Sequence, residues 1–108
     1  MRGAQLAGYR KFDIIEAETP QTRDGQVLIK TERASICGSD LRTYDRALPE
    51  ESYPIRLGAP CHEVLGEIVE SRTDELKVGD RVIVIPTNSG GLVEYMAEGP
   101  DRCIKIPG

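Results

Sequence analysis

The sequence predicts a mostly β domain, a small antiparallel barrel or sandwich with one or two short helices. Its apolar residues form short runs separated by turn residues. Eleven glycines and seven prolines in 108 residues favour many short elements joined by turns. No strand–helix–strand unit and no Gly-x-Gly-x-x-Gly motif occurs, so no dinucleotide-binding Rossmann domain is expected within residues 1–108. We expect one domain with an aliphatic core, since the sequence has no Trp and a single Phe.

The first half of the sequence predicts strands followed by one helical turn. Residues 6–15 fit one or two strands, and Asp24-Gly25 fits a turn before a strand from Val27 toward Ile36. Residues 39–44 predict a short helical turn in which either Ser39 or Asp40 is the N-cap.

The second half begins with a loop, residues 47–60, which contains three prolines. Gly66 lies inside the strand predicted for residues 63–70 and indicates a bulge or a close backbone approach. The wholly apolar run 82–85, which follows a tight turn at 78–81, predicts a strand buried on both faces. A turn at 88–91 and strands at 92–97 and 103–106 complete the prediction.

Charge and composition argue against several classes of protein. The net charge is −4 with no basic stripe, which argues against nucleic acid as a partner. No apolar run approaches the roughly 20 residues that span a bilayer, and the first residues lack the apolar region of a secretory signal. Three cysteines without a Cys-x-x-Cys motif argue against a disulfide framework and favour the cytoplasm.

The residues best suited to bind a metal or take part in catalysis lie in two segments, Cys37-Gly38-Ser39-Asp40 and His62-Glu63. Thiol, imidazole and carboxylate are the ligand types of catalytic zinc sites. Cys37 is either a small buried apolar residue or a metal-binding thiolate. Its position between a strand and a helix start favours the thiolate, which helix N-terminal N–H groups stabilise.

The other candidate residues each allow two interpretations. His62 is either a hydrogen-bonded histidine at a strand edge or a metal ligand. A regular strand would point His62 and Glu63 to opposite faces. Glu63 can therefore serve the same metal only if the backbone bends between them, or if Glu63 contacts the metal ligands without binding the metal itself. Asp40 is a helix cap, an acceptor that orients the imidazole, or both. Ser39 is a cap or a hydroxyl beside the metal.

Two further thiols and one tyrosine carry weaker signals. Cys61 and Cys103 are interpreted as structural or incidental thiols, of which Cys61 is nearer to a metal at His62. Tyr44 is either a pocket residue or an exposed helix tyrosine.

The order of several motifs resembles the N-terminal domain of zinc-dependent medium-chain alcohol dehydrogenases. The similarity covers nearly the whole chain and rests on residues 27–30, 35–41, 62–69, 78–82, 90–95 and 104–107. The Cys-Gly-Ser-Asp form is most similar to the polyol, threonine and sugar dehydrogenase branch.

The resemblance implies a GroES-like β-barrel that supplies catalytic zinc ligands. By family analogy Cys37 and His62 are ligands, and Glu63 is a ligand or a switchable carboxylate behind them. Ser39 matches the hydroxyl that relays the substrate proton, and Asp40 matches the residue that orients the ligand histidine. Zinc would lower the pKa of a small alcohol or polyol, and NAD or NADP would accept the hydride.

The sequence departs from the family pattern in four places. Cys61 replaces the usual Gly before His-Glu, which would strain the backbone if the site needs a glycine conformation. Arg42 lies near the usual end of the proton relay and is a poor proton shuttle. The segment between residues 85 and 90 is too short for the four-cysteine lobe, so we expect one catalytic zinc and no structural zinc. The family's nucleotide-binding domain would follow residue 107.

These observations leave three hypotheses of function. In the first, the chain is the catalytic domain of a zinc alcohol or polyol dehydrogenase, inactive without its nucleotide-binding domain. In the second, it is a stand-alone barrel that acts as a non-catalytic binding or assembly module, or a gene remnant. In the third, it is a zinc-free quinone reductase relative, which the retention of Cys37 and His62 disfavours.

Overall fold

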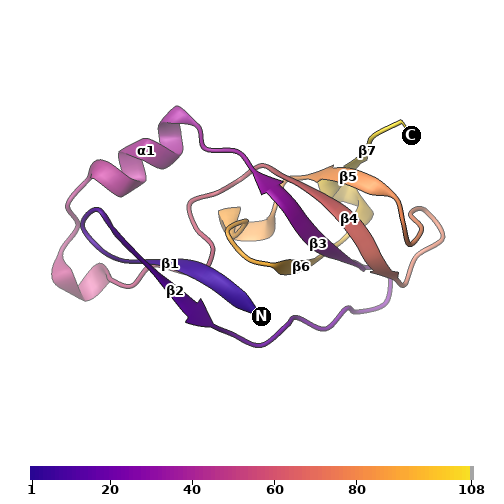
Figure 1. The fold of residues 1–108 in the computed structure, drawn as a ribbon, viewed down its shortest axis with the longest axis horizontal. Helices are drawn as coiled ribbons and strands as arrows, with labels where there is room; N and C mark the ends of the chain where they lie inside the picture. Colours follow the sequence, from indigo (N-terminus) through magenta and orange to yellow (C-terminus); the bar gives the residue numbers. More distant parts are fainter. Residues whose placement is uncertain (108) are drawn as a thin grey trace.

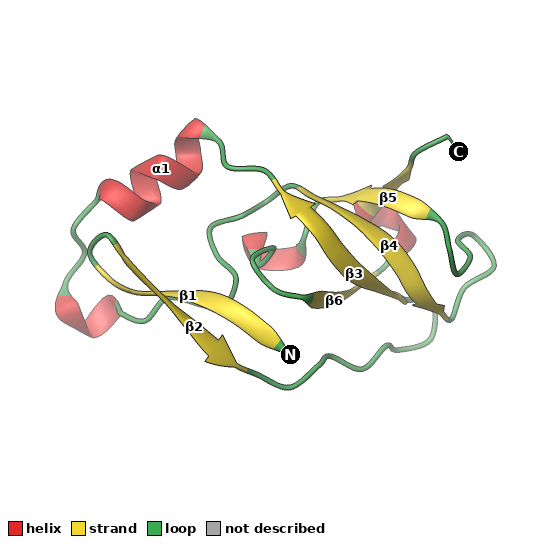
Figure 2. Ribbon diagram, in the orientation of Figure 1, coloured by secondary structure: helices red, strands yellow, loops and turns green. Residues whose placement is uncertain are grey.

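The computed structural model describes residues 1–107 as seven strands, one α-helix and three short 3₁₀ helices (Figures 1 and 2). The strands are β1 (Arg2–Gly8), β2 (Lys11–Glu16), β3 (Val27–Ala34), β4 (Val64–Ser71), β5 (Arg81–Val84), β6 (Tyr95–Glu98) and β7 (Cys103–Lys105). The helices are α1 (Gly38–Asp45), η1 (Glu50–Ser52), η2 (Thr87–Ser89) and η3 (Pro100–Arg102). The prediction of a mostly β domain with little helix is confirmed.

The strands form two antiparallel sheets. β1 and β2 make a hairpin, and the other strands form a sheet in the order β6-β3-β4-β5-β7. Within the described residues the sheets are not closed into one hydrogen-bonded barrel. A bridge between Gly3 and Val93 joins them, and Ala4 N–H donates to the carbonyl of Leu92. The hairpin therefore extends to one side of the larger sheet, as Figure 1 shows.

The core of the larger sheet is aliphatic, as the composition predicted. Six side chains that are at most 1% exposed come from β3, β4 and β5: Val27, Ile29, Val64, Ile68, Val82 and Val84. Each contributes about 1.5–3 kcal/mol by leaving water. Together they hold the three strands in register and so determine where the connecting loops begin.

Gly66 lies where β3 and β4 approach each other closely. A Cβ atom there would come within 2.6 Å of the Lys30 carbonyl oxygen, and the β3–β4 register shifts between Thr31 and Arg33. Both alternatives that the sequence predicted at this glycine, a bulge and a close approach, are present.

The prediction that residues 82–85 are buried on both faces is wrong. Val82 and Val84 are fully buried, whereas Ile83 is half-buried and Ile85 is 46% exposed. The physical reason is that β5 belongs to an antiparallel sheet that packs on one face only within the described residues.

The start of α1 also differs from the prediction. The N-cap is Cys37, with extended backbone dihedrals, so Ser39 and Asp40 both lie inside the helix. The Asp40 carboxylate still satisfies a free backbone donor, because its Oδ2 accepts a hydrogen bond from the Cys37 N–H at 3.1 Å. Among residues 1–107, no helix is long and apolar enough to cross a membrane.

Candidate metal centre

Cys37 and His62 lie 25 positions apart in the sequence and meet because two chain segments pair beside them. Cys37 follows the end of β3, and His62 precedes the start of β4. The Ser35 N–H donates to the Glu63 carbonyl at 3.0 Å, which extends the β3–β4 pairing by one bond. The sheet thus holds the two side chains at the same corner of the molecule.

The separation of the thiol and the imidazole fits a shared metal ion. Cys37 Sγ lies 3.6 Å from His62 Nε2 and 3.8 Å from Nδ1. A tetrahedral zinc with Zn–S of about 2.3 Å and Zn–N of about 2.0–2.1 Å separates its sulfur and nitrogen ligands by roughly 3.6 Å. The chemistry and the spacing of these two donors therefore fit zinc.

Asp40 joins these two residues by using both of its carboxylate oxygens. Oδ1 lies 3.2 Å from His62 Nδ1, and Oδ2 accepts the Cys37 N–H. The Asp40 side chain is 4% exposed, whereas that of His62 is 40% exposed. Ligand atoms of Cys37, Asp40 and His62 all lie within 4.8 Å of one another. Asp40 can therefore orient the imidazole, with Nε2 left for a metal, or contribute an oxygen itself.

Ser39 lies beside the thiol on the first turn of α1. Its hydroxyl oxygen is 2.8 Å from Cys37 Sγ, and the side chain is exposed. A hydroxyl in this place can exchange protons with a molecule that approaches the thiol from solvent. Ser39, Cys37, Asp40 and His62 are thus four predicted site residues that the structure brings together.

Glu63 is not brought into this group. Its side chain is exposed and lines a separate hollow of about 400 Å³, together with residues of β3, β4 and β5 such as Arg33, Leu65 and Ile83. Its carboxylate is absent from the cluster of potential metal ligands found in residues 1–107. Its predicted role as a ligand or a carboxylate behind the ligands stays a prediction.

The other two cysteines lie in apolar surroundings. The fully buried Cys61 thiol contacts the carbonyl oxygens of Ser35 (3.7 Å) and Glu63 (3.6 Å), and burial raises its pKa. Burial raises the pKa of Cys103 to about 11. Cys61 is not among the residues with positive φ, so the strain considered for a cysteine at this position does not arise.

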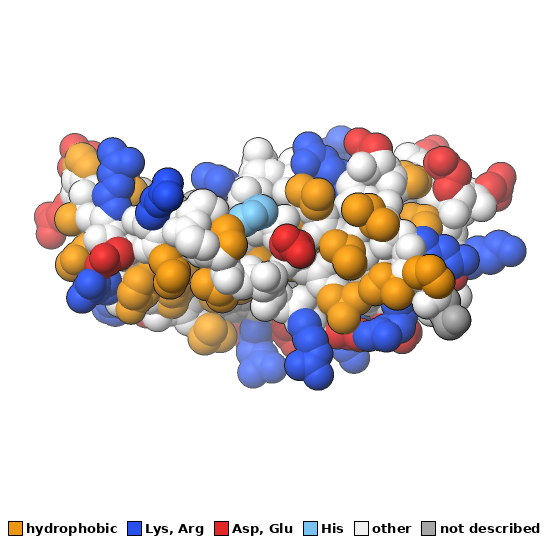
Figure 3. All heavy atoms as spheres, turned by 90° about the horizontal axis from the view of Figure 1, so that it is seen from above, with side chains coloured by type: hydrophobic (Ala, Val, Ile, Leu, Met, Phe, Trp, Pro, Cys, Tyr) orange, Lys and Arg blue, Asp and Glu red, His pale blue; other side chains and the backbone are white. Residues whose placement is uncertain are grey.

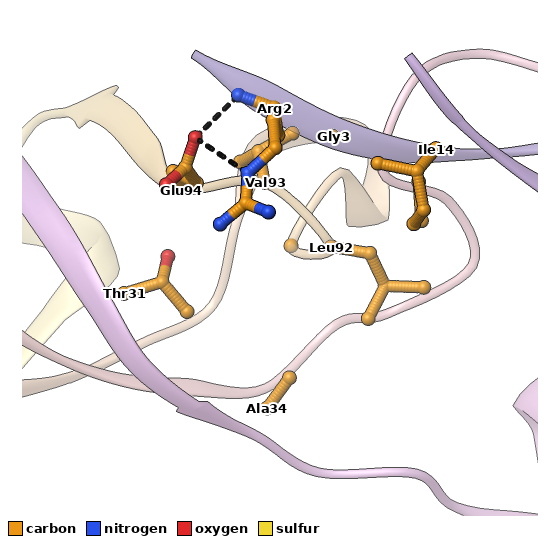
Figure 4. Close-up of a pocket in the computed structure, with 10 residues that line it drawn as sticks. Arg2, Gly3, Ile14, Thr31, Ala34, Leu92, Val93 and Glu94 are labelled. Carbon is orange, nitrogen blue, oxygen red and sulfur yellow. Dashed lines mark hydrogen bonds and ion pairs between the residues drawn. The ribbon is translucent and has the colours of Figure 1, made fainter. Parts of the chain in front are cut away.

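Two hollows lie near the hairpin. One, of about 370 Å³, is lined by apolar side chains such as Ile14 and Leu92, and also by Arg2 and Glu94, which form an ion pair with each other (Figure 4). A smaller one, of about 210 Å³, touches Asp40 and is lined by Tyr44 and Phe12, whose rings stack with centroids 5.9 Å apart. Tyr44 is therefore a pocket residue. Its stacking on Phe12, which joins helix α1 to hairpin strand β2, could not be predicted from the sequence.

Comparison with known proteins gives one family match. A family model described as "Alcohol dehydrogenase GroES-like domain" matches residues 23–108. An uncharacterised zinc-type alcohol dehydrogenase-like protein of Haemophilus influenzae is 43% identical over 74 residues, which cover 66% of this chain and 21% of that protein. The (R,R)-butanediol dehydrogenase of Bacillus subtilis is 35% identical over 143 aligned residues, covering 99% of this chain and 40% of the relative.

A solved structure gives a matching fold. The crystal structure of 2R,3R-butanediol dehydrogenase from Bacillus subtilis superposes with a TM-score of 0.76 at 27% identity, over 98% of this chain and 40% of that one. The chain thus spans from about a fifth to two fifths of the length of these relatives.

Proposed function

The chain belongs to the alcohol dehydrogenase GroES-like domain family, and from this premise we propose that it is the zinc-binding catalytic domain of an NAD(P)-dependent alcohol or polyol dehydrogenase. The substrate would be a small primary or secondary alcohol that is oxidised to a carbonyl compound. Names of relatives such as butanediol and sorbitol dehydrogenase support this substrate class.

The observation that carries the proposal is the distance of 3.6 Å between Cys37 Sγ and His62 Nε2. Zinc bound between these atoms would act as a Lewis acid that lowers the pKa of an alcohol. The half-exposed position of His62 leaves the site open to a small molecule from solvent.

The remaining residues would prepare the site and handle the proton. Asp40 would hold the imidazole of His62 through Nδ1 and so direct Nε2 outward. Ser39 Oγ would accept the proton of the substrate hydroxyl and pass its own hydroxyl proton to solvent water, because it lies beside the thiol and its side chain is exposed. Glu63 is proposed as a carboxylate that reaches the site after a side-chain rearrangement. Arg42 would not continue the relay, because a guanidinium stays protonated.

The redox step needs a nucleotide that a second domain would bind. We propose that a nucleotide-binding domain holds the NAD or NADP. The relatives are long enough to contain such a domain outside the segment that they share with this chain. One catalytic zinc and no structural zinc are proposed. The 143-residue alignment with butanediol dehydrogenase exceeds this chain's 108 residues, so the relative has insertions that this chain lacks. The free cysteines support a reducing cytoplasm.

Metal binding tests the site directly. We expect the chain to bind one zinc ion, or one cobalt ion with a thiolate-to-cobalt absorption band, and Cys37→Ala and His62→Ala to abolish the band. The matched control is Cys103→Ala, which removes a thiol outside the cluster. Unchanged metal content in Cys37→Ala would reject the site. If the chain is instead a zinc-free quinone reductase relative, neither the unmodified chain nor any variant should bind the metal.

The second candidate function is a stand-alone barrel that acts as a binding or assembly module, and the size of the native polypeptide separates it from the first. An immunoblot band roughly three times larger than 12 kDa supports a dehydrogenase of two or three domains. A band at 12 kDa supports the stand-alone module. The isolated chain should show no NAD-dependent turnover with added zinc, and turnover would contradict the need for a second domain.

A further inference from the structure

The connection between β5 and β6 contains a strained turn. Asn88 and Ser89, within η2, have backbone φ angles of 57° and 54°. Positive φ is uncommon for residues that carry a Cβ atom, and it persists only where the surroundings hold the backbone in place. We call residues 86–91 the η2 loop, which lies between the hairpin and the larger sheet (Figure 1, orange). Backbone strain of this kind concentrates at functional sites.

Two side chains hold the η2 loop in this conformation. Glu98 on β6 is 6% exposed, and both of its carboxylate oxygens face Thr87. Oε2 accepts the Thr87 N–H at 2.9 Å, and Oε1 accepts the Thr87 hydroxyl at 2.6 Å. From the other side, Arg56 Nε donates to the Asn88 carbonyl. A buried carboxylate is costly unless donors satisfy its oxygens, and here a single residue of the loop supplies both donors.

The η2 loop packs directly on the segment that precedes His62. The Gly91 N–H donates to the Cys61 carbonyl at 3.0 Å, and the Leu92 N–H donates to the Gly58 carbonyl at 3.0 Å. No side chain fits at this contact. A Cβ atom on Gly58 would overlap the Gly90 carbonyl, and one on Gly91 would lie 2.9 Å from Cys61 Sγ. A shift of the loop therefore shifts the backbone at Cys61.

The position of the His62 imidazole depends strongly on this backbone. The side chain is 40% exposed and lies at the surface in Figure 3, so few neighbouring side chains can fix it. Asp40 Oδ1, 3.2 Å from Nδ1, restrains the ring on one side. A zinc site tolerates errors of only about 0.2 Å in its ligand distances. A ligand on an exposed imidazole thus needs a backbone that does not move.

We propose that Glu98 is a positioning residue of the metal centre. Through Thr87 it fixes the η2 loop, and the loop fixes the backbone that carries His62. This inference rests on the proposed function, because His62 is positioned as a zinc ligand. An apolar side chain could occupy the place of Glu98 in β6 at little cost in stability if Thr87 also lost its donor. Only an acceptor holds Thr87 where it is.

A matched pair of variants at Thr87 tests the proposal. Thr87→Val removes the hydroxyl donor with little change in shape, whereas Thr87→Ser keeps it, and the exposed position lets both variants fold. Thr87→Val should weaken zinc binding by about tenfold, measured by competition with a chelator, and should alter the absorption of bound cobalt. Thr87→Ser should retain both properties. Glu98→Gln, which offers one acceptor oxygen to two donors, should behave like Thr87→Val.

The control for a general loss of stability is Ile68→Val, a small deletion at a fully buried position of β4. It should lower the melting temperature and leave the zinc affinity of the folded chain unchanged. The proposal is wrong if Glu98→Gln affects zinc binding no more than Ile68→Val does at a similar loss of melting temperature. It is also wrong if Thr87→Ser is impaired as much as Thr87→Val.

A measurement without metal separates this proposal from the proposed function. The chain has one histidine, so the imidazole of His62 gives a single set of NMR signals. In the metal-free protein, Thr87→Val and Glu98→Gln should shift these signals, whereas Thr87→Ser and Ile68→Val should not. Absence of zinc binding in the unmodified chain would reject the metal centre. Unchanged imidazole signals in Thr87→Val and Glu98→Gln would reject the positioning role of Glu98.

Discussion

In the larger sheet the side chains that fix the structure are aliphatic and fully buried, whereas at the corner of Cys37 and His62 they are polar and partly exposed. The sheet depends on the apolar surface removed from water, which many aliphatic combinations can provide. The corner depends on a few distances between specific atoms. Fold and chemistry can therefore be altered separately by mutation, except that the corner exists only while the sheet positions it.

The largest effect should come from removing core volume. Ile68→Ala empties a fully buried position on β4 and should lower the free energy of unfolding by about 2–5 kcal/mol. The total free energy of unfolding of a domain of this size is about 5–15 kcal/mol, so this loss raises the unfolded fraction. Zinc binding should fall accordingly. Urea denaturation measures the loss, with the 69% exposed Ile14→Ala as the control. Equal losses in the two variants would contradict the assigned core.

A somewhat smaller loss should follow from adding a single methyl group at the β3–β4 contact. In Gly66→Ala the new Cβ meets the Lys30 carbonyl, and such overpacking costs about 1–3 kcal/mol. Gly8→Ala is the matched control, because the nearest atom to its Cβ is at 4.0 Å. Thermal unfolding should separate the two variants clearly. A Gly66→Ala protein as stable as Gly8→Ala would mean that the strands lie farther apart than described.

The next change acts at the corner and should leave the sheet intact. Asp40→Asn keeps an oxygen for the Cys37 N–H but loses the carboxylate that faces His62 Nδ1. Loss of such an orienting group lowers metal affinity by about 10–100-fold. Zinc affinity is measured by competition with a chelator, and unfolding is followed in the metal-free protein. Asp45→Asn on the same helix, where Asp45 pairs with Arg10 at the surface, should change neither quantity appreciably.

If Asp40 served only as a helix cap, Asp40→Asn would retain full zinc affinity, and Asp40→Ala would lose stability without a further loss of zinc. If Asp40 were itself a metal ligand, the loss in Asp40→Asn would approach that of His62→Ala. The three results are distinct, so the role left open between capping, orientation and ligation is decided by one series of variants.

The sequence predicted the sheet better than the corner, for a physical reason. Alternating and continuous apolar runs determine strands, and β3, β4, the turn at Asp24-Gly25 and the close approach at Gly66 were predicted. The start of β1 at Arg2 was missed, because the prediction for the first segment covered only residues 6–15. The helix cap was misplaced by two or three residues, because Cys37 is not a usual capping residue. The side on which Glu63 lies depends on the backbone path between Cys61 and Val64, which sequence periodicity does not determine.

The smallest expected effect concerns the reactivity of the three cysteines in the intact fold. A thiol alkylates through its thiolate, so a raised pKa slows the reaction at a pH below that value. Cys103, with a pKa of about 11, and the buried Cys61, whose pKa is also raised, should react slowly with iodoacetamide at pH 8. Cys37 should react first, because its Sγ lies beside the exposed Ser39 hydroxyl, and bound zinc should protect it.

Peptide mass spectrometry gives the order in which the three cysteines are alkylated. The reference is the urea-unfolded chain, in which all three should react at similar rates. Raising the pH from 8 to 10 should accelerate the alkylation of Cys103, because a larger fraction of this thiol is then ionised. A Cys37 that reacts as slowly as Cys61 in the metal-free protein would show that the corner is closed to solvent, and an alcohol could then not reach it either.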